Sequence, residues 1–196
     1  MLNKKLLAVF IVTTSIISAP SLLAHGGATG IVKERMDLMD DMKSAMKELS
    51  SIFKGQQAYD AAVIRQAAST INQHSGDAIT RLFPEDSLKN SEAQPTIWQE
   101  WQHFQDLADR QERLSQGLYN AAENNHTAST GNMMGNSGMM SNQNMMGTMM
   151  SGSSTDLMLN SPMDTSEHYS SMPSEMTFRM LAENCSSCHK SYRKKD

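Results

Sequence analysis

The stretch FRMLAENCSSCHKSYR, residues 178–193, decides the fold because its distinctive side chains recur at helical spacing. The spacing predicts a helix that follows Pro173 and reaches about Arg193. One side of this helix carries Phe178, Leu181, Cys185, Cys188 and Tyr192. The chain has two cysteines, both here and three positions apart, and His189 follows the second one. The helix therefore presents two thiols and an imidazole within little more than one turn.

Three kinds of site use two cysteines and a nearby histidine. A thioredoxin-like redox pair stands between a strand and a helix, and no stretch of this sequence alternates convincingly like a strand. A zinc site needs further ligands, but the chain has no third cysteine and its other histidines are scattered. The pattern C-x-x-C-H is typical of covalent haem attachment, in which the thiols add to the haem vinyl groups and the histidine ligates the iron. A simple disulfide beside a histidine is the remaining alternative.

The N-terminus has the pattern of a secretory signal. Lys4 and Lys5 precede an apolar run at 6–19, and a small residue, Ala24, ends the segment. We predict that 1–24 is a signal peptide, cleaved after Ala24, and that the mature protein is periplasmic. Thiols outside the cytoplasm are oxidised unless something occupies them, which strengthens the haem interpretation.

The composition narrows the class of partner. Without Lys4 and Lys5 the mature chain has 15 basic and 21 acidic side chains, a net charge of −6. An acidic chain is a poor ligand for nucleic acid, whose phosphates attract basic proteins. No long apolar segment remains after residue 24, so we expect no membrane span in the mature chain.

Three more stretches have helical periodicity. They cover about 30–53, about 58–83 with Gly76 as a break near the middle, and about 96–124 after Pro95. The first carries Ile31, Arg35, Met39, Met42, Met46 and Leu49 on one face. The expected fold is an all-α, antiparallel four-helix bundle, with three helices in 25–126 and a haem-attachment helix in 173–196.

The segment 127–172 differs from both parts of the bundle. It is rich in Met, Asn, Gly and Ser, and residues 132–150 contain four Met-Met pairs and no charge. Such a composition cannot offset its ordering entropy, so we predict a disordered insertion between the third and fourth helices. Thioethers suit Cu(I), and the new N-terminus at His25 could chelate Cu(II), so copper binding is one interpretation. Oxidant scavenging by methionine and neutral drift of a tolerant loop are the others.

Four quoted stretches make the chain resemble class II cytochrome c, the cytochrome c-prime family, and most of all its methionine-ligated cytochrome c-556 type. These are GIVKERMDLM in the first helix, YDAAVIRQAASTI with LFPEDS in the second, PTIWQEWQHFQDLADRQERL in the third, and FRMLAENCSSCHKSYR in the last. The resemblance implies one haem c per chain on Cys185 and Cys188, with His189 as the proximal iron ligand. It also implies Met39 as the distal ligand and Arg35, four residues earlier, beside a haem propionate.

This resemblance implies an electron carrier, not an enzyme. A His/Met pair of ligands occupies both axial positions of the haem iron. Such an iron suits single-electron exchange with redox partner proteins. The basic residues at 190–195 could guide an acidic partner or simply complement a helix end. A five-coordinate, gas-binding cytochrome c-prime and a copper-binding protein are the alternatives. Relatives of this kind include both monomers and homodimers, so either state is compatible with the sequence.

Overall fold

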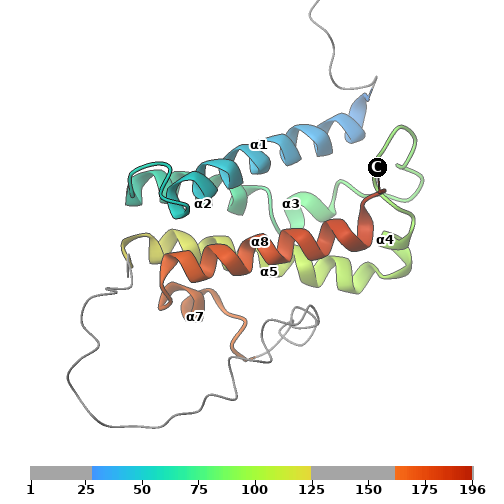
Figure 1. The fold of residues 1–196 in the computed structure, drawn as a ribbon. Coiled ribbons are helices and arrows are strands. Elements are labelled where there is room, and N and C mark those ends of the chain that lie inside the picture. Colours follow the sequence, from blue (N-terminus) through green and yellow to red (C-terminus); the bar gives the residue numbers. More distant parts are fainter. Residues whose placement is uncertain (1–27, 125–161, 196) are drawn as a thin grey trace, which may run out of the picture.

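Four long helices run side by side in alternating directions (Figure 1). The structure, a computed structural model, describes residues 28–124 and 162–195. The long helices are α1 (Gly30–Phe53), α2 (Ala61–Gln73), α5 (Trp101–Asn120) and α8 (Ser174–Tyr192). Shorter ones are α3 (Asp77–Thr80), α4 (Thr96–Gln99), α7 (Ser166–Ser170) and the 3-10 turn η1 (Ala121–Glu123). Within the described ranges the only strand-like pairing is an isolated bridge between Ala93 and Arg193. The predicted all-α four-helix bundle is confirmed.

Helix α5 lies at the centre of the bundle and packs against both α2 and α8. Helix α1 packs on α2 but makes few contacts with α8. The core is formed by fully buried side chains of all four long helices: Leu49, Ile64, Ile71, Leu107, Leu114, Leu118 and Leu181. Each buried leucine or isoleucine contributes roughly 1.5–3 kcal/mol from its removal from water. None of the helices in the described ranges is long and apolar enough to cross a bilayer.

Helix α1 begins and ends where the sequence predicts, but its buried face is rotated slightly. Its fully buried residues are Val32, Arg35, Leu38, Met42, Ala45, Leu49 and Ile52. Met39 and Met46 lie at the edge of this stripe and are half-buried. Beyond the helix, Gly55 adopts a positive φ of 69° that turns the chain toward α2.

The second and third predicted helices are each interrupted. Asp60 caps α2 by accepting hydrogen bonds from the backbone of Ala62 and Val63, and Gly76 separates α2 from α3 with a φ of 57°. A break at Glu100, with φ −119° and ψ 37°, divides α4 from α5. The broken helices let the chain between α3 and α4 reach the end of the bundle where α8 finishes.

The predicted insertion extends too far toward the C-terminus. Residues 162–172, which we assigned to the disordered segment 127–172, are ordered, and α7 packs against α5 (Figure 1). Tyr169 is 1% exposed, and its hydroxyl donates a 2.6 Å hydrogen bond to Asp164, which also accepts one from Arg113. The composition of residues 162–172 does not predict this packing, because the packing depends on a few polar contacts with α5 and not on an apolar period. The remaining residues of the predicted insertion and its proposed copper site lie outside the described ranges. The predicted signal peptide and His25 lie outside them as well.

Gly117 allows α7 to approach α5 closely. A Cβ at this position would lie 2.3 Å from the Tyr169 Cβ and 3.3 Å from the Ser166 carbonyl oxygen. We therefore expect Gly117→Ala to lower the free energy of unfolding by about 1–3 kcal/mol, because two backbones must separate. Urea denaturation followed by circular dichroism measures this loss. Gln116→Ala, one position away and partly exposed, serves as the control and should change stability by less than about 0.5 kcal/mol. Equal unfolding midpoints would contradict the tight contact.

Candidate functional site

Cys185, Cys188 and His189 lie in the last two turns of α8. The rotation of α8 is fixed by the preceding residue, Asn184, whose fully buried amide donates a 2.9 Å hydrogen bond to the Leu107 carbonyl of α5. Both thiols are half-buried and they are not joined to each other. Among the described residues there is no group of three or more His, Cys, Asp or Glu placed to hold a metal ion by themselves.

The environment of these groups sets their protonation. Burial raises the pKa of Cys185 to about 11. Burial, with the neighbouring Cys185 as a second cause, raises the pKa of Cys188 to about 12. Partial burial and then the charge of Arg193 lower the pKa of His189, so its imidazole is neutral at neutral pH. The neutral ring keeps the nitrogen lone pair that an iron ligand needs.

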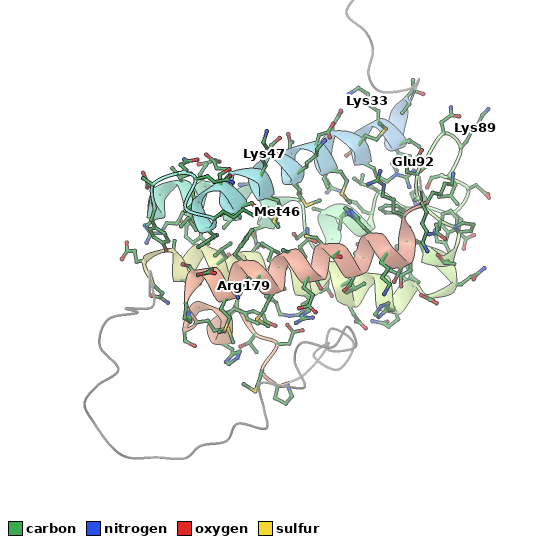
Figure 2. The ribbon with its side chains drawn as sticks, viewed as in Figure 1. Lys33, Met46, Lys47, Lys89, Glu92 and Arg179 are labelled. Atoms are coloured by element: carbon green, nitrogen blue, oxygen red, sulfur yellow. The ribbon has the colours of Figure 1, made fainter. Side chains whose placement is uncertain are left out.

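Helix α1 carries four methionines and makes few contacts with α8. Met46 stands between the two helices in Figure 2. Met39, about two turns earlier and half-buried, packs at the edge of the core, whereas Met42 is only 7% exposed. The sulfur of Met42 accepts a 3.0 Å hydrogen bond from the Gln111 amide of α5. Two methionines that the sequence could not separate thus have different surroundings.

Arg35 is a buried cation with spare hydrogen-bond donors. Its side chain is on the buried face of α1 and its guanidinium carbon lies 4.5 Å from the centre of the Phe83 ring. One terminal nitrogen donates to the Ser87 carbonyl, while Nε and Nη1 have no partner among the described residues. Desolvation lowers the pKa of this arginine, although not enough to discharge a guanidinium. A buried arginine with two unpartnered guanidinium nitrogens fits a carboxylate such as a haem propionate.

Aromatic side chains connect Arg35 to the end of α8. Phe83 contacts Phe104 edge-to-face at 5.0 Å between ring centres, and Phe104 contacts Tyr192 at 5.5 Å. Trp98 donates its indole N–H to the Phe83 carbonyl at 2.9 Å, and Trp101 lies 5.6 Å from Phe104. These rings are part of the core or packed against it.

The C-terminal end of α8 is fastened to the chain between α3 and α4. Gln94 donates its backbone N–H to the Tyr192 carbonyl at 2.8 Å, and Lys194 donates its own to Glu92 at 2.7 Å. The Lys194 ammonium also reaches the Ser91 carbonyl at 2.7 Å. Lys33, Lys89 and Glu92 lie at this same end (Figure 2). The exposed charges around the end of α8 are therefore of both signs.

Two residues of this region, Gln111 and Phe83, were not predicted from the sequence. Gln111 continues the spacing of Leu107, Leu114 and Leu118 along α5, so a polar side chain on an apolar stripe could have drawn attention to it. Phe83 had no such signal, since it stands in an irregular turn before Pro84 and only the fold brings it to Arg35.

Comparison with known proteins identifies the family of the chain. A family profile described as Cytochrome C' matches residues 30–142, which include α1, α2 and α5. The match ends before residue 185, so the C-x-x-C-H motif is an independent observation. Cytochrome c-556 of Agrobacterium tumefaciens (strain II Chrys) is 34% identical over 79 residues, 40% of this chain and 64% of that protein. Cytochrome c' of Rhodopseudomonas palustris (strain ATCC BAA-98 / CGA009) is 30% identical over 81 residues, 40% of this chain and 55% of that protein. The chain therefore spans between half and two thirds of these relatives.

Solved structures share the fold. The cytochrome c' structure from Rhodopseudomonas palustris superposes with a TM-score of 0.55 at 18% identity, covering 86% of this chain and 99% of that one. A nitric oxide complex of a cytochrome c' variant from Alcaligenes xylosoxidans gives 0.54 at 19% identity, covering 85% and 94%. The family profile, the four helices and the haem-binding motif agree. This chain belongs to the cytochrome c' family, whose members are c-type cytochromes with covalently bound haem.

Proposed function

We propose that this cytochrome is an exported carrier of single electrons with a six-coordinate iron. Cys185 and Cys188 hold the haem c, His189 supplies the proximal ligand and Met39 the distal one. Arg35 pairs with a propionate. The haem supplies the ferrous–ferric couple, and the chain positions it and sets its surroundings.

The two unpartnered guanidinium nitrogens of the buried Arg35 are the observation on which this assignment rests. Two buried guanidinium nitrogens without hydrogen-bond partners lower the stability of the fold unless an anion accepts their hydrogen bonds. It lies on α1, one turn before Met39, while the thiols and the imidazole come from α8. Since α1 and α8 make few contacts with each other, the two helices can supply ligands to opposite faces of one flat group. This placement supports Met39 as the methionine nearest to the iron.

The choice of ligands favours electron transfer. A thioether and an imidazole hold both oxidation states of iron, so little rearrangement accompanies the transfer of an electron. The proposed chemistry requires no nucleophile or general base, which agrees with a carrier that does not transform a substrate. Redox partner proteins would exchange the electron, and the signal-like residues 1–24 support a periplasmic site for this exchange.

A visible spectrum of the reduced, purified protein tests the proposal. Sharp low-spin α and β bands are expected for His/Met ligation. A broad high-spin Soret band with rapid carbon monoxide binding would instead favour gas binding, a function of interest because a variant of one fold relative forms a nitric oxide complex.

Substitution of the distal ligand identifies it directly. We expect Met39→Ala to convert the low-spin spectrum to a high-spin one, because alanine offers no ligand atom. Met46→Leu, on the same helix and equally half-buried, is the matched control and should retain the low-spin bands. If the spectrum of Met39→Ala stays low-spin, another residue is the distal iron ligand and the assignment of Met39 is wrong.

A further inference from the structure

Gln111 lies between the two helices that carry the proposed haem ligands. It belongs to α5 and is 9% exposed. Its amide nitrogen is 3.0 Å from the Met42 sulfur of α1, and its amide oxygen is 3.7 Å from the Cys185 sulfur of α8. A single buried amide therefore joins α1 to the sulfur that the motif assigns to haem attachment.

The orientation of this amide follows from the chemistry of sulfur. A thioether can accept a hydrogen bond but has no proton to donate, so the amide nitrogen must face Met42. The oxygen consequently faces Cys185. The same contacts place the Met42 sulfur one amide group away from the Cys185 sulfur, which would hold the haem.

We propose that Gln111 is a positioning residue that lowers the reduction potential of this cytochrome by holding a carbonyl oxygen at the Cys185 edge of the haem. The inference rests on the proposed function and extends it to the control of potential. The ferric centre has one more positive charge than the ferrous centre, so the negative end of the amide dipole stabilises the ferric form more. Burial strengthens the effect because little solvent screens it. The hydrogen bond to Met42 fixes the amide, so its oxygen would still face the Cys185 sulfur once the thiol had added, sulfur and hydrogen, across a haem vinyl group.

Potentiometric titration of the purified holoprotein tests the inference. Gln111→Leu is expected to raise the potential, reducing the ferric-to-ferrous ratio at a fixed applied potential by about threefold or more. Such a change corresponds to about 28 mV for a one-electron couple, at about 59 mV per tenfold. The low-spin spectrum should persist, since neither axial ligand is altered. Gln111→Glu keeps an oxygen at the same position, so its potential should be at or below that of the unchanged protein.

Two further variants distinguish an effect of the Gln111 dipole on the potential from an effect of altered core packing. Ser115→Ala removes another fully buried polar group of α5, one that bonds Asn72 of α2 instead of facing Cys185, and should leave the potential unchanged. Met42→Leu preserves volume but frees the amide to turn, so the potential should rise less than with Gln111→Leu. If Gln111→Leu does not fold, Met42→Leu alone still tests the inference.

The outcomes distinguish this inference from the proposed function. An unchanged or lowered potential in Gln111→Leu would overturn the role of Gln111 while leaving His/Met ligation intact. A Gln111→Glu potential as high as that of Gln111→Leu, or no response to Met42→Leu, would overturn it as well. A high-spin spectrum in the unchanged protein would instead refute the six-coordinate carrier, and the inference with it.

Discussion

Purified Cys185→Ala/Cys188→Ala protein is expected to contain no covalently bound haem. The two side chains are the only cysteines in the chain, and they lie three residues apart on α8 with half-buried thiols that are not bonded to each other. Alanine leaves the helix intact but removes both sulfur atoms that can add to vinyl groups. Haem absorbance that remains with the polypeptide after denaturation and acidic extraction measures the covalent fraction, which should fall to background.

The single variants and a neighbouring residue provide the controls. Cys185→Ala and Cys188→Ala should each keep one thioether, seen as an α band displaced to longer wavelength because one vinyl group stays conjugated. Ser186→Ala changes an exposed residue between the two cysteines and should leave the covalent fraction unchanged. Haem that survives denaturation in the double variant would mean that another residue holds it. A colourless unchanged protein with Cys185 bonded to Cys188 would refute the haem assignment.

Asp164→Asn is expected to lower the free energy of unfolding by about 3–5 kcal/mol, a large share of the roughly 5–15 kcal/mol that stabilises a typical domain. The Asp164 side chain is 1% exposed and lies 2.6 Å from Arg113 and 3.7 Å from Arg110. An asparagine would leave these cations beside a neutral amide in a buried site. Urea denaturation at neutral pH measures the loss. Glu175→Gln breaks an exposed pair with Arg179 of equal length, 2.6 Å, and should cost less than about 1 kcal/mol.

The acid dependence of stability gives a second measurement. Burial opposes ionisation of Asp164, but hydrogen bonds from Arg113 and Tyr169 and the two arginine charges outweigh it, so the pKa of this carboxyl is lowered. A lowered pKa stabilises the folded protein above the unfolded value of about 3.9, and the contribution is lost as the pH falls through the lower folded value. The unchanged protein and Asp164→Asn should therefore differ most at neutral pH and converge in strong acid. A constant difference across this range would show that the carboxylate charge contributes nothing.

Local pattern predicted most of the bundle because each long helix carries its own apolar period. The predicted helix at about 30–53 corresponds to α1, and Pro173 placed the start of α8. The break at Glu100 and the short helix α7 were not predicted. The bend at Glu100 has no sequence signal, and α7 depends on Asp164 meeting arginines about fifty residues away. Contacts of that kind do not follow a helical period.

Some features of the candidate site were also predicted from the sequence, and others depended on tertiary packing. A fixed spacing brings Cys185, Cys188 and His189 together on any helix, so the sequence alone determined that a c-type haem motif ends this chain. Which side chains of other helices surround this motif depends on tertiary packing. Periodicity could not separate Met39 from Met42, because neighbouring positions on one face differ only in what stands opposite them. The folded chain separates them by placing Gln111 against Met42 and by burying Arg35 against Phe83. Spacing acts within one helix, whereas the surroundings of a side chain depend on the rotation and depth at which helices meet.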